Sequence, residues 1–260
     1  MDLGLEGRAA IVTGASRGIG RHVALQLVAE GCRVLLVGRD REALAAVQAE
    51  AGGQTAPLAC DVIDPSSAEL MVAECRRLLG RLDIVVNNAG QAEPKALVDL
   101  TPADWQRSLE VNFLAAARLS VAALPVMQAA GWGRLVHVAS ISGREPDPLF
   151  APYSAAKAAL LNLSTSLSRA AAADGVLSSC VIPGVTATEL VRDNAVATAE
   201  RTGRSPDEVM ERLLAKHGVA AGRFGRAEEV AAAVVFLASE AASWITGATL
   251  EVDGGTLRAT

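Results

Sequence analysis

The feature that most constrains the fold of this chain is a glycine-rich turn between two short apolar runs near the N-terminus. Residues 8–13 form a β-rich apolar run, and Gly14-Ala-Ser-Arg-Gly18-Ile-Gly20 follows at once. A helical apolar pattern continues to Gly31, which suits a helix C-terminus, before a second apolar run over 33–37. Strand, glycine turn, helix and strand make the unit that binds dinucleotides, because glycines let the backbone approach a pyrophosphate at the helix N-terminus. A purely structural turn is the alternative that the glycines alone leave open.

The rest of the chain repeats this alternation of short apolar runs and helical patterns. Further strands are expected over 55–60, 82–86, 133–139 and 177–182, and after Gly247. Hydrophobic residues make up 51% and aromatic residues 3%, which favours many helices on a buried sheet over a β-sandwich. We predict an α/β protein with a single Rossmann domain over residues 1–260, built on a doubly wound parallel sheet of about seven strands with helices on both faces. A polar insertion at about 186–222, with a helical core at 206–214, is expected to form a lid over the substrate.

Charge and residue spacing exclude several other classes of protein. The formal net charge is −5 and basic residues are scattered, so no nucleic-acid surface is expected. Charges interrupt the apolar runs, and the N-terminus lacks a basic region before an apolar core, so neither a transmembrane helix nor a signal peptide is expected. No metal-ligand or disulfide spacing relates the four cysteines and three histidines, which are Cys32, Cys60, Cys75, Cys180, His22, His137 and His217. We therefore expect a cytoplasmic protein without a metal site.

The only tyrosine of the chain, Tyr153, heads a helical pattern that carries Lys157 four residues later. Positions i and i+4 lie on the same face of a helix, so the phenol and the ammonium are expected to be neighbours. A nearby positive charge lowers the pKa of a phenol and makes it a useful proton donor near neutral pH. A chance pair on a solvated helix face is the alternative. Ser140, at the carboxyl end of an expected strand, stands where an active-site hydroxyl belongs in an open α/β sheet.

Several short motifs follow the glycine turn in order. They are Asn87-Asn-Ala-Gly90, Asn112 in an apolar helix, Ser140, the Tyr153/Lys157 pair, Pro183-Gly184 and Val252-Asp-Gly-Gly255. Together with Thr13 and the Gly-x-x-x-Gly-x-Gly turn, this series resembles the short-chain dehydrogenase/reductase family over nearly the whole chain. The resemblance implies a homotetramer, or a homodimer, and a widened helix at Asn112. It also implies four catalytic residues: Asn112, Ser140, Tyr153 and Lys157.

The resemblance further implies which residues contact the coenzyme and the substrate. The expected coenzyme-binding residues are Gly14, Ser16, Arg17, Gly18, Ile19, Gly20, Arg39, Asp61, Val62, Asn88, Ala89, Gly90, Tyr153, Lys157, Pro183, Gly184, Val185 and Thr188. The expected substrate-pocket residues are Ser142, Arg144, Leu149 and Phe150, in the loop between Ser140 and Tyr153.

The end of the second strand decides between NAD and NADP. An acidic residue there binds the ribose 2′-hydroxyl of NAD, whereas arginine suits the 2′-phosphate of NADP. Arg39 and Asp40 stand side by side, and in the family the acid that selects NAD falls where Arg39 stands. Arg17, in the glycine turn, is a second cation able to reach a 2′-phosphate, and guanidinium suits phosphate. We therefore favour NADP(H); the alternative role of Asp40 is to cap a helix that begins near Arg41.

These motifs predict an NADP-dependent oxidoreductase that interconverts a ketone and a secondary alcohol, with Tyr153 as general acid and base. The nearest well-known family members are 3-oxoacyl-carrier-protein reductases, which place basic residues at helix ends beside the active site. The corresponding stretches here, 128–131 and 172–174, lack basic residues, and a negative net charge would repel an acidic carrier. We therefore rank a free carbonyl or alcohol above a 3-oxoacyl thioester on carrier protein or CoA. A catalytically silent NADP-binding protein ranks below both.

Overall fold

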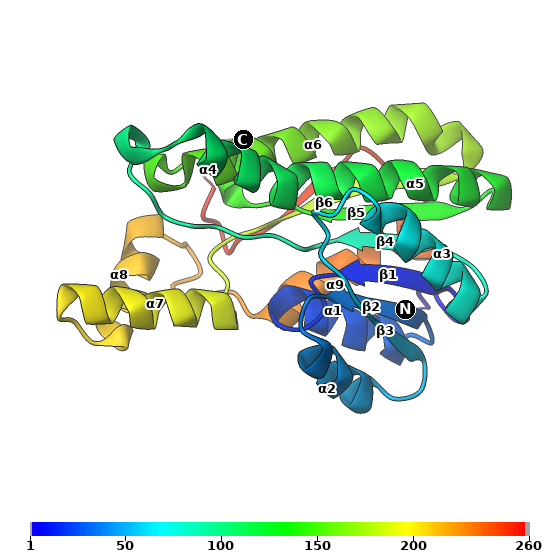
Figure 1. Ribbon diagram of the computed structural model, residues 1–260, viewed down its shortest axis with the longest axis horizontal. Coiled ribbons are helices and arrows are strands. Elements are labelled where there is room, and N and C mark those ends of the chain that lie inside the picture. Colours follow the sequence, from blue (N-terminus) through cyan, green and yellow to red (C-terminus); the bar gives the residue numbers. More distant parts are fainter. Residues whose placement is uncertain (1, 258–260) are drawn as a thin grey trace.

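The computed structural model describes residues 2–257, and its centre is a twisted parallel sheet (Figure 1). In the described part of the chain seven strands run in the order β3-β2-β1-β4-β5-β6-β7, every neighbouring pair parallel. The strands are β1 (Ala9–Thr13), β2 (Arg33–Gly38), β3 (Thr55–Ala59), β4 (Ile84–Asn87), β5 (Gly133–Val138), β6 (Val176–Pro183) and β7 (Thr249–Val252). Central strands such as β1, β4 and β5 are buried along their whole length, as expected where helices cover both faces. The predicted fold class is confirmed.

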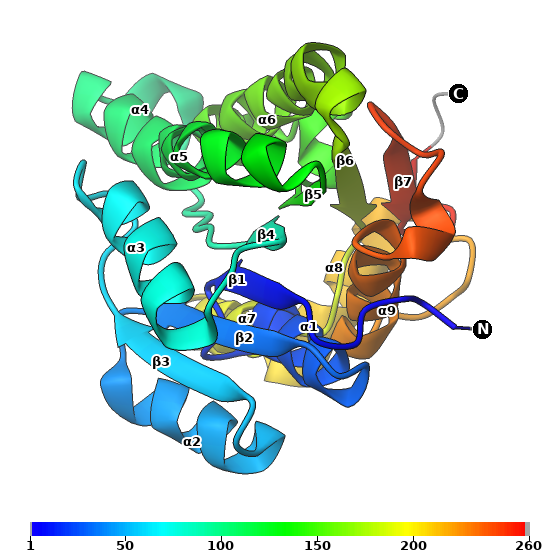
Figure 2. The same ribbon diagram turned by 90° about the vertical axis from the view of Figure 1, so that its right-hand side faces the viewer.

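Two groups of helices cover the two faces of the sheet (Figure 2). The first face carries α1 (Gly18–Ala29), α2 (Arg41–Ala51) and α9 (Ala227–Leu237), and the second carries α3 (Ser67–Leu79), α4 (Pro102–Leu109), α5 (Ala115–Ala130) and α6 (Ala151–Ala171). Apart from α4, which has no buried residue, each of these helices buries an apolar stripe, for example Leu27 of α1 on the first face and Met127 of α5 on the second. Burial of these two layers against the sheet is the main force that stabilises the fold.

The direction of winding reverses at β1. The chain passes from β1 to β2 and β3 on one side, and then returns to place β4 on the other side of β1. The carboxyl ends of β1 and β4 therefore form a switch point, and open α/β sheets bind ligands in the crevice outside such a point.

The helix that carries Asn112 is continuous but not regular. Helix α4 passes through a π-helical turn at Glu110–Leu114 before it continues as α5. Such a turn inserts one residue into the helix and is frequent at functional sites. The local widening implied by the family resemblance is therefore present.

The run Pro102–Ala130 is apolar enough, by length and composition, to cross a membrane. A charge still interrupts it, because Arg118 lies within its apolar part. Its neighbours explain this composition: α5 packs against α3, α6, β4 and β5 in the second layer of the protein.

The insertion after β6 contains two helices where the sequence predicted one helical core. Helix α8 (Pro206–His217) covers the predicted segment, and α7 (Glu189–Thr202) precedes it. Both project together from one end of the sheet (Figure 1). Thr188 caps α7 by accepting the Val191 N–H. Threonine at this position is typical of a helix start, but the polar composition of the segment made this start hard to recognise in the sequence. Only Ala195 and Ala199 of α7 are buried, so its hydrophobic periodicity is weak.

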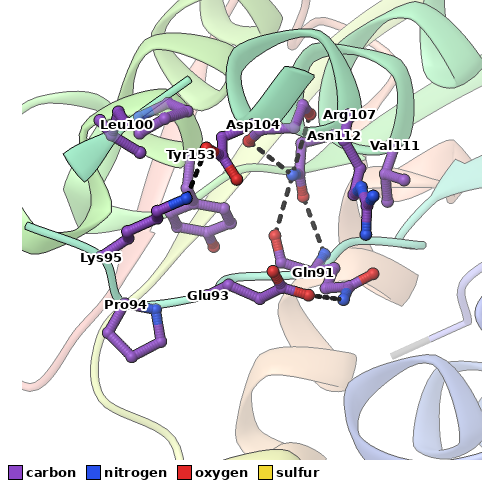
Figure 3. Close-up of a pocket in the computed structure, with 12 residues that line it drawn as sticks. Gln91, Glu93, Pro94, Lys95, Leu100, Asp104, Arg107, Val111, Asn112 and Tyr153 are labelled. Carbon is purple, nitrogen blue, oxygen red and sulfur yellow. Dashed lines mark hydrogen bonds and ion pairs between the residues drawn. The ribbon is translucent and has the colours of Figure 1, made fainter. Parts of the chain in front are cut away.

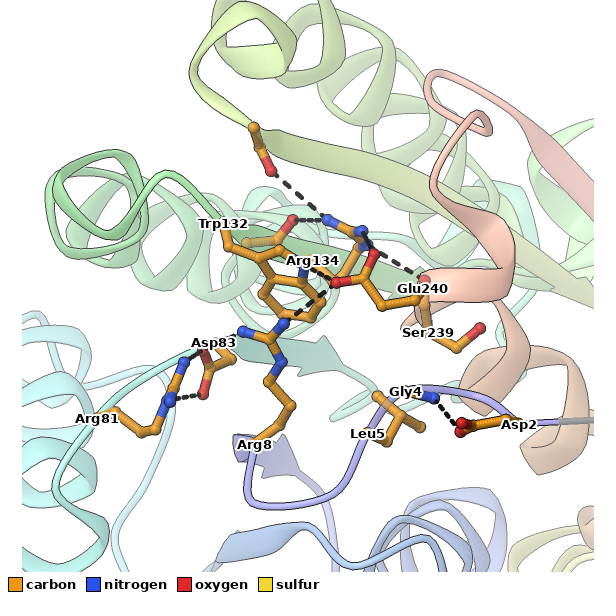
Figure 4. Close-up of polar contacts among 12 residues, drawn as sticks. Asp2, Gly4, Leu5, Arg8, Arg81, Asp83, Trp132, Arg134, Ser239 and Glu240 are labelled. Carbon is orange, nitrogen blue, oxygen red and sulfur yellow. Dashed lines mark hydrogen bonds and ion pairs between the residues drawn. The ribbon is translucent and has the colours of Figure 1, made fainter.

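A cation–π cluster ties the amino ends of the strands together (Figure 4). The guanidinium carbons of Arg8 and Arg134 lie 3.7 and 4.2 Å from the ring centroid of Trp132. The indole N–H donates to Glu240 at 2.6 Å, and Glu240 also accepts from Arg8 at 3.1 Å. Residues far apart in the sequence are thereby joined at the amino ends of the strands, which is the end of the sheet opposite the crevice.

We expect Trp132→Leu to lower the free energy of unfolding by about 2 kcal/mol, because it removes two cation–π contacts and one hydrogen bond to a charged group. Urea denaturation followed by circular dichroism measures this loss. Trp244→Leu is the matched control, since Trp244 is 98% exposed and its loss should cost no more than about 0.5 kcal/mol. Equal losses in the two variants would contradict a stabilising role for the cluster.

Candidate active site

The glycine turn is joined directly to the loop after β4. Thr13 at the end of β1 donates its hydroxyl to the Val86 carbonyl at 3.2 Å and accepts the N–H groups of Asn88 and Ala89 at 3.0 and 3.1 Å. The Asn88 amide donates in return to the carbonyls of Thr13 and Gly14, at 2.9 and 3.2 Å. These bonds hold the glycine turn and the loop after β4 together on one side of the crevice.

The conformation of the turn explains its glycines. Gly14 and Gly18 have φ angles of 66° and 56°, where residues with a Cβ are strained. At Gly20 a Cβ would lie 2.3 Å from the Gly14 carbonyl oxygen and 2.4 Å from the Asn88 amide nitrogen, so only glycine fits. The side chain of Arg17, the N-cap residue of α1, makes no capping hydrogen bond, and the first turn of α1 carries no acidic residue. The positive end of this helix therefore fits a pyrophosphate.

Asn112 is buried and holds the loop that follows Gly90. Its Oδ1 accepts the Gln91 N–H at 3.0 Å, and its Nδ2 donates to the Gln91 carbonyl at 2.9 Å and to the Ser108 carbonyl at 3.0 Å. The π-helical turn thus presents a full side-chain amide to the backbone of the loop beside the coenzyme crevice. The sequence did not identify Gln91, because its backbone rather than its side chain makes these contacts.

Lys157 is buried beneath this loop, on α6. Its ammonium donates to the Val138 carbonyl at 2.7 Å, and a Cβ on Gly90 would lie 3.5 Å from its Nζ and 2.9 Å from Asn112 Oδ1. Asn112 and Lys157 therefore meet at Gly90. Burial lowers the pKa of Lys157 to about 8.

The electrostatic expectation for Tyr153 was wrong. Burial raises the pKa of its phenol, and only a hydrogen bond with Ser140 opposes this rise. The expected lowering by Lys157 is missing because its ammonium faces the Val138 carbonyl and lies 5.6 Å from the centroid of the phenol ring. Ser140 stands directly after β5, and its hydroxyl also accepts the Ser142 N–H at 3.1 Å. Tyr153 and Ser140 are thus brought together by α6 and β5.

The residues expected at the adenosine end lie at the carboxyl ends of β2 and β3. Asp40 accepts the N–H groups of Glu42 and Ala43 at 3.0 and 3.1 Å and so caps α2, which is the alternative role that the sequence left open for it. Arg39 is exposed beside it. Asp61 follows β3 and accepts the Ile63 N–H at 3.3 Å within its own turn.

The segment after β6 lies on the other side of the crevice. The Gly184 N–H donates to the Val252 carbonyl at 3.0 Å, and a Cβ there would lie 2.6 Å from the Asp253 Cα, so this position requires glycine. Val185 accepts the Gly225 N–H at 3.0 Å. The side chain of Thr188 lies against the glycine turn, 3.5 Å from the position of a Cβ on Gly18. The two expected coenzyme segments therefore face each other.

A cavity of about 90 Å³ adjoins Tyr153 and Asn112 (Figure 3). Its wall carries opposite charges: Lys95 donates to Asp104 at 2.7 Å, and Arg107 lines the cavity further along α4. None of the four predicted substrate residues lines it. The sequence did not identify Lys95, although its spacing from the Asn-Asn-Ala-Gly motif places it on the crevice loop.

The predicted substrate residues have different surroundings. Ser142 lines a second cavity, beneath α8. Arg144 instead forms an ion pair with Glu251 on β7, because the edge strand offers it a carboxylate. Leu149 is 45% exposed, and its carbonyl accepts the Lys95 N–H at 2.8 Å; Phe150 is partly buried at the start of α6.

A buried polar chain crosses the sheet below the site. The Asn87 amide donates to Ser120 Oγ at 3.0 Å and contacts His137 Nδ1 at 3.2 Å. His137 Nε2 contacts Ser178 Oγ at 3.2 Å, and Ser178 contacts Ser164 at 3.0 Å. Since an amide nitrogen only donates, Nδ1 accepts and the proton of the neutral ring is on Nε2. Burial, with Lys157 nearby, lowers the pKa of His137 to about 3.

The doubly wound parallel sheet, with its glycine turn at the switch point and with Ser140, Tyr153, Lys157 and Asn112 gathered beside it, is that of a dinucleotide-dependent oxidoreductase. Residues 14–256 match the family model described as enoyl-(acyl carrier protein) reductase. The chain belongs to the short-chain dehydrogenase/reductase family.

Relatives with different substrates resemble the chain over its whole length. It is 38% identical over 253 residues to the 3-oxoacyl-[acyl-carrier-protein] reductase FabG of Salmonella typhimurium, covering 97% of this chain and 98% of the relative. It is also 38% identical to cis-4-hydroxycyclohexanecarboxylate dehydrogenase of Sinomonas cyclohexanicum, covering 95% and 96%. The crystal structure of L-sorbose reductase from Gluconobacter frateurii, complexed with NADPH and L-sorbose, has a TM-score of 0.94 at 31% identity, with full coverage of both chains.

Proposed function

We propose that the protein is an NADP(H)-dependent oxidoreductase that interconverts a free ketone and a secondary alcohol. The observation that carries the proposal is the convergence of Ser140, Tyr153, Lys157 and Asn112 at the rim of a crevice suited to a dinucleotide. They come from the end of β5, from helix α6 and from the π-helical turn.

The coenzyme, when bound, supplies the hydride that the carbonyl carbon receives. Ser140 donates a hydrogen bond to the carbonyl oxygen and stabilises the charge that develops there. Tyr153, already hydrogen-bonded to Ser140, donates the proton to the same oxygen. Lys157 holds positive charge beside the site while its own ammonium is fixed by the Val138 carbonyl. Asn112, which holds the Gln91 backbone, would complete a proton path through water to solvent.

The substrate is proposed to be free rather than bound to a carrier. An acidic carrier would need cations at the helix ends beside the active site. There, the neutral side chain of Gln128 donates to the carboxylate of Asp174 at 2.6 Å, so this surface carries a negative charge and no cation. A reductase acting on 3-oxoacyl thioesters is the second candidate, favoured by the FabG relatives.

A spectrophotometric screen tests this proposal. Oxidation of NADPH and of NADH would be followed at 340 nm against ketones of graded size and charge, with acetoacetyl-carrier protein as one member. Turnover of free ketones with NADPH supports the proposal, whereas a strong preference for the carrier substrate would favour the second candidate. Constant absorbance with every compound would favour a catalytically silent protein.

Arg39→Ala tests the coenzyme preference. Loss of a charge-assisted hydrogen bond to the 2′-phosphate should raise the Kd for NADPH about 10- to 100-fold and leave that for NADH nearly unchanged. Fluorescence titration of each coenzyme measures the two constants. Arg76→Ala, an exposed arginine in the last turn of α3, is the control that removes the same charge away from the crevice. A similar rise for NADH would contradict the role of Arg39.

Assembly and domain organisation complete the proposal. We propose one domain over 1–260 with a lid at about 186–222, acting in the cytoplasm as a homotetramer or homodimer. The exposed apolar side of α5, which includes Val121 at 60% exposure, is available for contact with a second copy. An ion pair of 2.5 Å between Lys216 of α8 and Asp147 of the Ser140–Tyr153 loop supports closure of the lid over the substrate side.

A further inference from the structure

Asp193, on helix α7 of the proposed lid, forms an ion pair with Arg17 of the glycine turn. Arg17 Nη1 donates to Asp193 Oδ2 of α7 at 3.3 Å, and the two side chains are 56% and 66% exposed. One helical turn earlier, Glu189 Oε2 lies 3.6 Å from the position that a Cβ on Gly18 would take. Positions 189 and 193 share one face of α7. This face therefore places two negative charges against the glycine turn.

These carboxylates face groups that suit the phosphates of a dinucleotide. The N-terminus of α1 attracts anions, and its own first turn supplies none. Arg17 is the cation of the turn, and a guanidinium binds carboxylate and phosphate by the same charge-assisted hydrogen bonds. Asp193 thus makes with Arg17 the kind of contact that a 2′-phosphate would make.

We infer that Asp193 is a coenzyme-specificity residue that competes with the 2′-phosphate of NADP(H) for Arg17. The inference rests on the proposed function. Binding of NADPH exchanges the Arg17–Asp193 pair for an Arg17–phosphate pair and separates α7 from the glycine turn at this point. NADH has no 2′-phosphate, so it binds with the pair intact. Asp193 therefore weakens NADPH binding selectively and makes the contact between lid and turn depend on which coenzyme is bound.

The test compares Kd values of NADPH and NADH by fluorescence titration of the whole protein. Asp193→Asn should tighten NADPH about two- to fivefold, the range set by an exposed ion pair, and leave NADH unchanged. Glu200→Gln is the matched control, because Glu200 is an exposed carboxylate on the same helix, about two turns beyond Asp193. In an Arg17→Ala background, Asp193→Asn should no longer change the affinity for NADPH.

Two results would overturn the inference. One is equal tightening of NADPH and NADH by Asp193→Asn, matched by Glu200→Gln, since that identifies a general effect of net charge. The other is an unchanged Kd for NADPH in an Asp193→Asn protein whose circular dichroism matches the parent. Failure of the proposed function looks different: the parent protein would then bind neither coenzyme or reduce no ketone. If the parent protein binds both coenzymes, the difference in Kd between parent and Asp193→Asn reports on Asp193 alone.

Discussion

Tyr153→Phe is expected to lower kcat about 10²- to 10⁴-fold, the range that a positioned general acid contributes, while the Kd for NADPH stays nearly unchanged. The substitution removes only the hydroxyl, which is the proton donor of the proposed reaction and the partner of Ser140. The ring, which fills the wall of the cavity beside Asn112, remains. Steady-state kinetics with a ketone found in the screen, together with NADPH titration, measure both quantities.

Ser154→Ala is the matched control for this variant. Ser154 is the next residue on α6, is buried, and its hydroxyl has no hydrogen-bond partner in the described part of the chain. Its removal therefore loses no bond, and kcat should be retained. Retention of kcat in Tyr153→Phe would rule out Tyr153 as the proton donor, whereas equal losses in both variants would indicate disturbance of α6 rather than lost chemistry.

The second large effect is a loss of stability in acid caused by His137. Its pKa is about 3 in the folded protein against an ordinary value of 6.5, so below pH 6.5 the unfolded chain binds more protons than the folded one. The free energy of unfolding should therefore be fully retained above pH 6.5 and should fall by roughly 1.4 kcal/mol per pH unit between 6.5 and 3. Protonation of Nδ1 would also place two donors, Asn87 and His137, against each other.

Urea denaturation at several pH values between 6.5 and 4.5 measures this dependence, because most carboxylates stay ionised in that window. His137→Gln retains an acceptor and a donor for the buried chain and should flatten the curve. His217→Gln is the control: burial also lowers the pKa of His217, but this ring is partly exposed on α8, so a smaller part of the slope should disappear. An unchanged slope in His137→Gln would show that acid acts elsewhere in the molecule.

Much of the fold and of the candidate site could be predicted from the sequence because the features concerned are local. The glycine turn requires positive φ angles at Gly14 and Gly18 and leaves no room for a Cβ at Gly20, so its spacing is visible in the residues themselves. The alternation of strand and helix patterns predicted the parallel sheet. The four-residue spacing of Tyr153 and Lys157 placed both on α6.

The remaining features were decided by contacts between segments distant in the sequence. The ammonium of Lys157 is directed to Val138, so burial rather than the lysine charge governs the pKa of Tyr153. Arg144 forms an ion pair with Glu251 on the edge strand β7, and the residues of its own loop do not predict this partner. Helix α7 has little hydrophobic periodicity, because two alanines provide its buried surface.

Arg17 and His137 illustrate the same division within the site. The sequence by itself determined that an arginine stands in the glycine turn and that a histidine lies in a central strand. Only the tertiary structure decided that Asp193 of α7 pairs with that arginine, and that the histidine, in contact with Asn87 and Ser178, is kept neutral by burial. The physical reason is that backbone conformation follows from neighbouring residues, whereas the partner and the charge state of a side chain depend on which distant groups the packed sheet and helices bring within hydrogen-bond distance.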